Sequence, residues 1–167
     1  PSFTRTLDST KPTFSVPANT TISKAADCSY DASPGITGDV TDEADNCSTG
    51  LNATYSDVVL PGGCEGEEII TRYWTLVDNC GNSTVQQQTI TVADNNLPPT
   101  FTVPADIEIN RGADCTYNAS PSVTGDVTDE ADNCTDVLDA KYSDIITAGS
   151  CAGEEIITRT WTLTDAC

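Results

Sequence analysis

The chain has 167 residues, of which 26 are acidic and 7 are basic, and its formal net charge is −19 at pH 7. An excess of negative charge this large repels nucleic acid and anionic membranes, so we expect neither nucleic-acid binding nor membrane insertion. The chain has no histidine, which removes the commonest general base and transition-metal ligand. We therefore expect that the protein is not an enzyme.

The local sequence patterns are those of short β-strands, without helical periodicity. Alternation of apolar and polar residues predicts strands, in chain order, at 14–22, 28–32, 51–55, 68–77 and 84–92. Pro17 cannot donate a ladder hydrogen bond, so the first of these strands belongs at a sheet edge. Residues 78–82, Asp-Asn-Cys-Gly-Asn, predict a hairpin turn in which Gly81 takes a positive φ.

The strand at 68–77 is the longest and carries the main core positions. Its alternation places four side chains on one face: Ile70, Arg72, Trp74 and Leu76. We expect Trp74 to be buried in the core. Arg72 shares that face, so we expect it to pair with an acidic neighbour while its stem covers apolar surface.

The sequence repeats itself with a period of 87 residues. Phe14 corresponds to Phe101, Trp74 to Trp161, and every cysteine to another cysteine at the same offset. Between 11–80 and 98–167, 44 of 70 positions are identical without a gap. Self-similarity at a fixed period indicates a tandem array.

Repeats of this length, with six or seven short strands, fit an antiparallel β-sandwich. The predicted fold is therefore all-β, with tandem immunoglobulin-like sandwich repeats. Residues 12–98 form a complete repeat, 99–167 form a second repeat that lacks its last strand, and 1–11 are expected to be the closing strand of a preceding repeat.

Several motifs resemble those of hyalin-type (HYR-like) repeats. They lie at 45–47 (Asp-Asn-Cys), 53–57 (Ala-Thr-Tyr-Ser-Asp), 70–82, 89–94 and 98–101 (Pro-Pro-Thr-Phe). The variety most similar to this chain is the tandem form found in giant surface proteins of Bacteroidetes, including gliding-motility adhesins. The resemblance implies an immunoglobulin-like fold and an adhesion-related role outside the cell, at its surface.

Eight cysteines without a Cys-x-x-Cys pair favour disulfides, and hence an oxidising, extracellular compartment. The strand at 68–77 spans about 30 Å, which separates Cys64 from Cys80 too widely for a bond within one repeat. In an immunoglobulin-like topology Cys28 would lie near Cys64, with Cys47 and Cys80 at the other pole. The preferred pairs are therefore Cys28–Cys64, Cys47–Cys80, Cys115–Cys151 and Cys134–Cys167.

The resemblance to hyalin-type repeats implies a different pairing, Cys28–Cys47 and Cys115–Cys134. Under that pairing Cys64 would be left to bond between neighbouring repeats, for example with Cys167.

An acidic loop at 37–47 recurs unchanged at 124–134. Clustered carboxylates are hard oxygen ligands that suit Ca²⁺, and Ca²⁺ is the only cofactor we expect. The candidate ligands are Asp39, Asp42, Glu43, Asp45, Asp94 in the linker, Asp126, Asp129, Glu130 and Asp132. The alternative is a solvated turn whose carboxylates accept hydrogen bonds from their own backbone.

The sequence predicts a structural or adhesive module, a disulfide-stapled stalk within a long extracellular surface protein or filament. Two alternatives stay open: a module that binds polysaccharide or another surface, and a filament subunit that exchanges strands with its neighbours. The expected partners are neighbouring repeats of the same chain, identical chains in a filament, and surface polysaccharide.

Overall fold

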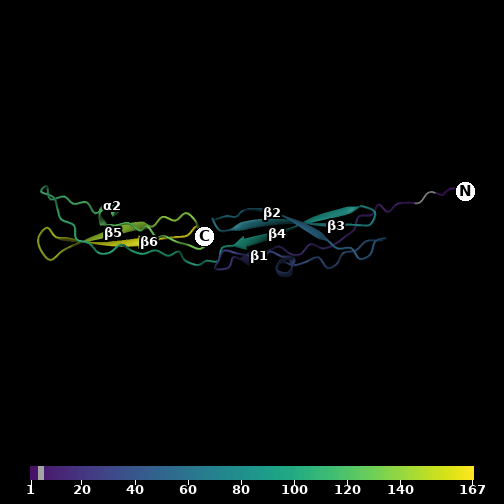
Figure 1. Ribbon diagram of the computed structural model, residues 1–167, viewed down its shortest axis with the longest axis horizontal. Coiled ribbons are helices and arrows are strands. Elements are labelled where there is room, and N and C mark those ends of the chain that lie inside the picture. Colours follow the sequence, from purple (N-terminus) through teal and green to yellow (C-terminus); the bar gives the residue numbers. More distant parts are fainter. Residues whose placement is uncertain (4–5) are drawn as a thin grey trace. The chain divides into compact units, whose positions relative to one another are not determined.

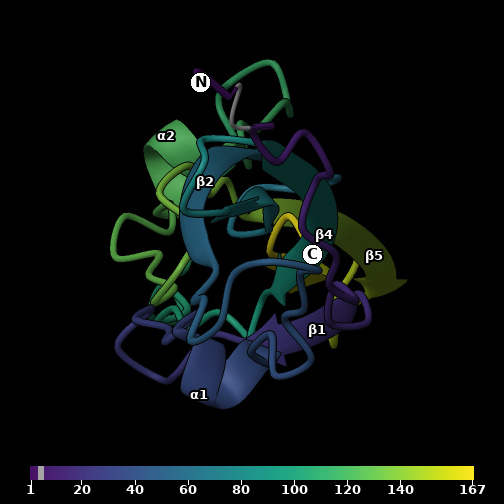
Figure 2. The ribbon, with the colours of Figure 1, turned by 90° about the vertical axis from the view of Figure 1, so that its right-hand side faces the viewer.

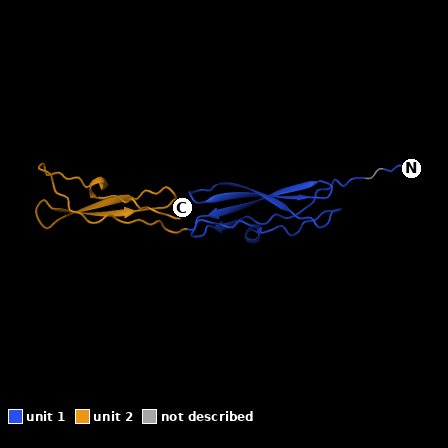
Figure 3. Cartoon of the chain, viewed as in Figure 1, with its two compact units in different colours: residues 1–95, 167 blue, residues 96–166 orange. Residues whose placement is uncertain are grey.

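The computed structural model describes residues 1–3 and 6–167 and divides into two compact units (Figure 3). Unit 1 comprises Pro1–Asn95 together with Cys167, and unit 2 comprises Asn96–Ala166. Strands dominate the regular structure of both units, and each unit has one helix of four residues. The fold of the described residues is all-β, as predicted.

Unit 1 contains a four-stranded sheet in the order β1-β4-β3-β2 (Figure 1). Its strands are β1 (Thr20–Ser23), β2 (Thr54–Pro61), β3 (Glu68–Val77) and β4 (Ser83–Ala93). β3 pairs antiparallel with both β2 and β4, whereas β1 runs parallel to β4. β3 has the predicted bounds, and β4 is one residue longer at each end than predicted.

The turn between β3 and β4 is the predicted hairpin. The Asp78 N–H donates to the Asn82 carbonyl at 3.0 Å, and Gly81 has a φ of 91°. Glycine has no Cβ and adopts this left-handed backbone without strain. The turn thereby fixes the register of the two longest strands.

The core lies on the predicted face of β3. Ile70, Trp74 and Leu76 are at most 2 % exposed. Trp74 and Leu76 pack with side chains from the coil that covers this face, namely Phe14, Val40 and Ala53. Ile70 packs with the inner face of β4, at Ile90 and Val92.

The layer opposite the sheet is mostly coil, which differs from the predicted strands. Residues 28–32 form no strand, the predicted strand at 14–22 is reduced to an isolated bridge at Thr13 and to β1, and the one at 51–55 begins at Thr54. Figure 2 shows this coil, with α1 (Pro34–Thr37), beside the sheet.

Side chains of β4 explain why this layer needs no strand ladder. Gln86 donates to the Phe14 carbonyl at 2.7 Å, and Gln88 donates to the carbonyls of Ala18 and Thr37 at 3.0 and 2.7 Å. Backbone carbonyls facing a core must be hydrogen-bonded. The glutamine amides satisfy them in place of a neighbouring strand.

The helices α1 and α2 (Pro121–Thr124) were not predicted, because four residues carry no periodic pattern. Gly38 ends α1 with a φ of 97°, and a Cβ there would lie 2.9 Å from the Pro17 Cβ. Among the described residues, neither helix is long enough to cross a membrane.

Unit 2 contains a two-stranded antiparallel sheet of β5 (Lys141–Ala148) and β6 (Glu155–Thr162). Its registers repeat those of unit 1, since Lys141 faces Thr162 as Thr54 faces Thr75. In the part of unit 2 that the structure describes, β6 has β5 as its only strand partner. Trp161 is half-buried, whereas Trp74 is buried.

A buried arginine ties the coil layer to the sheet in unit 1. Arg72 is 1 % exposed and bonds both carboxylate oxygens of Asp57 at 2.8 Å. It also donates to Thr37 Oγ1 at 2.8 Å and to the Ala32 carbonyl at 2.6 Å. Its guanidinium lies 4.2 Å from the Tyr55 ring centroid. The predicted acidic partner of Arg72 is confirmed.

The equivalent arginine of unit 2 has the same partners. Arg159 bonds Asp144, Thr124 and Ala119, and it lies over Tyr142 at 4.2 Å. The side-chain hydrogen bond with Asp144 is the main cause that raises the pKa of Arg159. The sequence repeat therefore preserves a complete side-chain network.

Candidate functional site

The acidic loop at 37–47 is held by hydrogen bonds to its own carboxylates. Asp39 accepts from the Val40 N–H at 2.9 Å, and Asp42 accepts from the Ser15 N–H at 2.8 Å. Glu43 accepts from the Ala53 N–H at 3.3 Å. Asp42 thereby connects the loop to the first coil segment, and Glu43 connects it to the residue before β2.

The copy of this loop in unit 2 makes the same bonds. Asp126 accepts from the Val127 N–H at 3.0 Å, and Asp129 accepts from the Thr102 N–H at 2.9 Å. Glu130 accepts from Ala140 and Asp132 from Cys134 and Thr135. In both units the loop carboxylates accept hydrogen bonds from backbone N–H groups, as the turn interpretation predicts. These bonds account for the identical sequence of the two loops.

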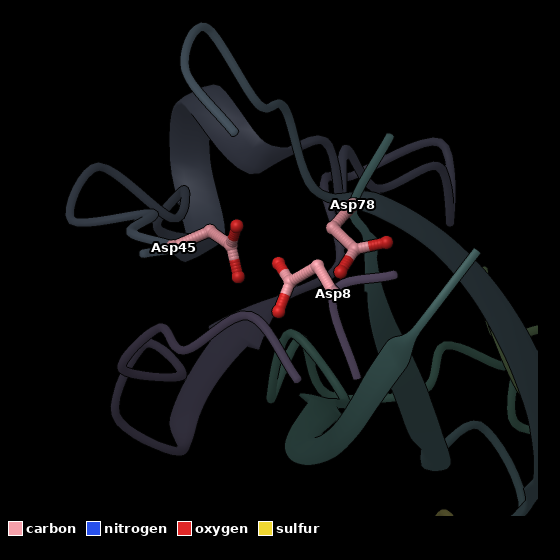
Figure 4. A group of neighbouring side chains, drawn as sticks. All are labelled: Asp8, Asp45 and Asp78. Carbon is pink, nitrogen blue, oxygen red and sulfur yellow. The ribbon is translucent and has the colours of Figure 1, made fainter. Parts of the chain in front are cut away.

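One of the predicted ligands, Asp45, joins an acidic cluster with two residues that the sequence did not indicate. Carboxylate oxygens of Asp8, Asp45 and Asp78 lie within 4.8 Å of one another (Figure 4). Asp8 comes from the N-terminal segment, Asp45 from the acidic loop and Asp78 from the end of β3. Asp39, Asp42 and Glu43 are not part of this cluster. Asp94 follows β4 and is buried.

Each carboxylate of the cluster already accepts hydrogen bonds from a turn. Asp78 accepts from the N–H groups of Cys80 and Asn82, both at 2.8 Å. Asp45 accepts from Cys47 and Ser48. Burial alone would raise the pKa of Asp78, but the hydrogen bonds from Asn82 and neighbouring N–H groups outweigh it and lower that pKa.

Asp8 is brought to the cluster by the hairpin turn. The Asn82 side-chain amide donates to the Asp8 carbonyl at 3.2 Å and to the Asp78 carboxylate at 2.6 Å. The hydrogen bond from the Thr10 N–H lowers the pKa of Asp8. Asp8 and Asp78 thus stay ionised at neutral pH, and three hard oxygen donors face one point.

The calcium hypothesis makes a thermal prediction for unit 1. Removing bound Ca²⁺ with EDTA is expected to lower the melting temperature, by about 4–8 °C for each kcal/mol of binding free energy lost. Asp8→Asn is expected to abolish the response to EDTA, whereas Asp27→Asn, outside the cluster, is expected to keep it. Melting curves that coincide with and without EDTA would instead assign the carboxylates to turn formation alone.

The disulfide that the structure defines joins the two sequence repeats. Cys64 bonds Cys167, with their Cα atoms 5.5 Å apart and 103 residues between them in sequence. The preferred pairs Cys28–Cys64 and Cys134–Cys167 are therefore wrong, because each sulfur has one disulfide partner. Cys28 and Cys134 are disulfide-bonded as well.

The remaining cysteines are exposed free thiols at Cys47, Cys80, Cys115 and Cys151. The pairs Cys47–Cys80 and Cys115–Cys151 are thus absent, and so are the alternatives Cys28–Cys47 and Cys115–Cys134. What the geometry did predict is the separation of Cys64 from Cys80. They lie in the turns at opposite ends of β3, so neither can bond the other within a repeat.

Two of the thiols are held in the protonated form. Burial and the negative charge of Asp8 raise the pKa of Cys47. A hydrogen bond with Glu154 raises the pKa of Cys151. The thiolate is the reactive species in disulfide exchange, so a raised pKa lowers the reactive fraction of each thiol.

Comparison with known proteins assigns no family to this arrangement. No family model and no curated protein sequence matches the chain.

Proposed function

We propose that the chain is a structural repeat module of a long extracellular surface protein or filament, in which it acts as a disulfide-stapled stalk. The observation that carries the proposal is the Cys64–Cys167 bond, which connects one sequence repeat to the next by a second covalent path. Disulfides of this kind persist in oxidising compartments outside the cytosol. Within this proposal each repeat is an immunoglobulin-like sandwich of the hyalin type, whose second layer is tied by glutamine and arginine side chains.

The features shared by the two repeats also favour a stalk. The arginine network and the hydrogen bonds of the acidic loop occur in both units. These groups bond the protein's own backbone and side chains, so they stabilise the repeat and are not held ready for a ligand. A net charge of −19 keeps such an array soluble and repels other acidic surfaces.

Binding assays separate a stalk from a recognition module. The 167-residue chain is presented to arrays of polysaccharides and to immobilised surface glycans, with a known lectin as the positive control. A stalk is expected to give no saturable binding above the signal of a chain unfolded by reduction. Tight, saturable binding to one class of glycan would contradict the stalk and favour the polysaccharide-binding alternative.

A further inference from the structure

The bonded and the free cysteines are related by the 87-residue repeat. The bonded residues are Cys28, Cys64, Cys134 and Cys167. Counting 87 residues forward from the first two, and back from the last two, gives Cys115, Cys151, Cys47 and Cys80. These are the four free thiols. Each free thiol therefore occupies the position in its repeat at which the other repeat has a disulfide.

The Cys64–Cys167 bond shows which positions combine. Cys167 is the counterpart of Cys80, so the bond joins a Cys64-type residue of one repeat to a Cys80-type residue of the repeat that follows it. Within one repeat the two positions lie at opposite ends of the ten-residue strand β3, about 30 Å apart. A bond of this type consequently requires two repeats.

We propose that the four free thiols are attachment points for further copies of the same repeat. Cys80 bonds the cysteine equivalent to Cys64 in the repeat before it. Cys151 bonds the cysteine equivalent to Cys80 in the repeat after it. The remaining thiols lie at the positions of Cys28 and Cys47, so Cys47 and Cys115 are expected to bond a cysteine at the other of these two positions in an adjoining copy. The inference rests on the proposed stalk function and extends it, because every junction would then carry two disulfides.

The backbone conformation at Cys115 indicates that the thiol of this residue has a function. Cys28 and Cys115 have φ values of 62° and 61°, in the left-handed region. A residue with a Cβ loses about 1–2 kcal/mol there, and glycine would avoid that cost. Both repeats nevertheless place cysteine at this position. Cys28 is disulfide-bonded, and its counterpart Cys115 is expected to be bonded when its partner is present.

The chemistry needs one disulfide oxidant for each bond. Two thiols join through a new S–S bond and release two protons and two electrons. Oxidised glutathione accepts them as its own S–S bond breaks into two thiols. The reaction proceeds through thiolate attack and a mixed disulfide.

Each copy of the chain carries both kinds of free thiol that a bond between repeats needs. A second copy of the same chain is therefore the probe. The purified 167-residue chain is oxidised with glutathione at high protein concentration, and disulfide-linked peptides are identified by mass spectrometry without reduction. We expect bonds between chains, Cys80 with Cys151 and Cys47 with Cys115, and a ladder of oligomers that disappears on reduction. Retention of the Cys64–Cys167 peptide reports that the chains are still folded.

Two matched variants decide the pairing. Cys47→Ser/Cys115→Ser leaves the complementary thiols Cys80 and Cys151, whereas Cys47→Ser/Cys151→Ser leaves the mismatched thiols Cys80 and Cys115. The complementary variant is expected to form at least roughly tenfold more disulfide-linked dimer, because only its thiols are held together by docked repeats.

Other outcomes overturn the inference. Equal dimer yields from the two variants, thiols that remain unoxidised, or a Cys47–Cys80 bond within one chain would each do so. A Cys47–Cys80 bond would leave the Cys64–Cys167 staple and the stalk function standing, so failure of the inference is distinguishable from failure of the proposed function. Oligomers that survive reduction would point to strand exchange in place of disulfide coupling.

Discussion

Arg72→Met is expected to lower the free energy of unfolding of unit 1 by about 3–5 kcal/mol. The substitution keeps an apolar stem against Tyr55 but removes the partner of the Asp57 carboxylate. It also removes the guanidinium donors to the Thr37 hydroxyl and to the Ala32 carbonyl. A domain of this size has a total stability of about 5–15 kcal/mol, so the loss is a large share of the unit's stability.

Amide hydrogen exchange along β3 measures this loss for unit 1 separately from unit 2. The matched control is Arg159→Met, which removes the same contacts in unit 2. Its side chain is 13 % exposed, compared with 1 % for Arg72, and water replaces lost partners more readily there. The control is therefore expected to cost less. A loss below about 1 kcal/mol at Arg72 would show that the buried network does not hold the layers together, and equal losses in the two units would contradict the effect of burial.

Cys64→Ser/Cys167→Ser is expected to destabilise the chain by about 4–5 kcal/mol. The bond between these residues has a sequence separation of 103. Closing a loop this long removes much of the conformational freedom of the unfolded chain. Denaturant unfolding of the oxidised chain and of the double variant measures the difference.

The control for this variant is Cys47→Ser/Cys80→Ser, which removes two exposed free thiols. It is expected to change the unfolding free energy by no more than about 0.5 kcal/mol. If both double variants were equally stable, the Cys64–Cys167 bond would add nothing to the folded state.

Long, strongly alternating segments were predictable from the sequence. β3, its buried face and the hairpin at Gly81 follow from local pattern and turn chemistry alone. The coil layer was not predictable in this way. Its alternation resembles that of strands, but its carbonyls bond the side chains of Gln86 and Gln88. Such contacts join residues 72 and 51 positions apart, which no local pattern records.

The candidate site was predictable only in part, for the same reason. Asp45 was identified from its loop, but Asp8 and Asp78 lie in segments without a metal-binding pattern and meet through Asn82. The preferred cysteine pairs were sought within one repeat and are wrong, whereas the alternative of a Cys64–Cys167 bond between neighbouring repeats is confirmed. The separation of Cys64 from Cys80 along β3 was the signal that pointed to a bond between repeats.

The stalk proposal is tested most directly by pulling single molecules of the 167-residue chain through handles fused to its two ends. With the Cys64–Cys167 bond intact, the segment between these residues is bypassed, and complete unfolding is expected to extend only the residues up to Cys64. Reduction of every disulfide is expected to add roughly 350 Å of contour length at about 3.4 Å per residue. Equal extensions of the oxidised and the fully reduced chain would contradict a disulfide-stapled stalk.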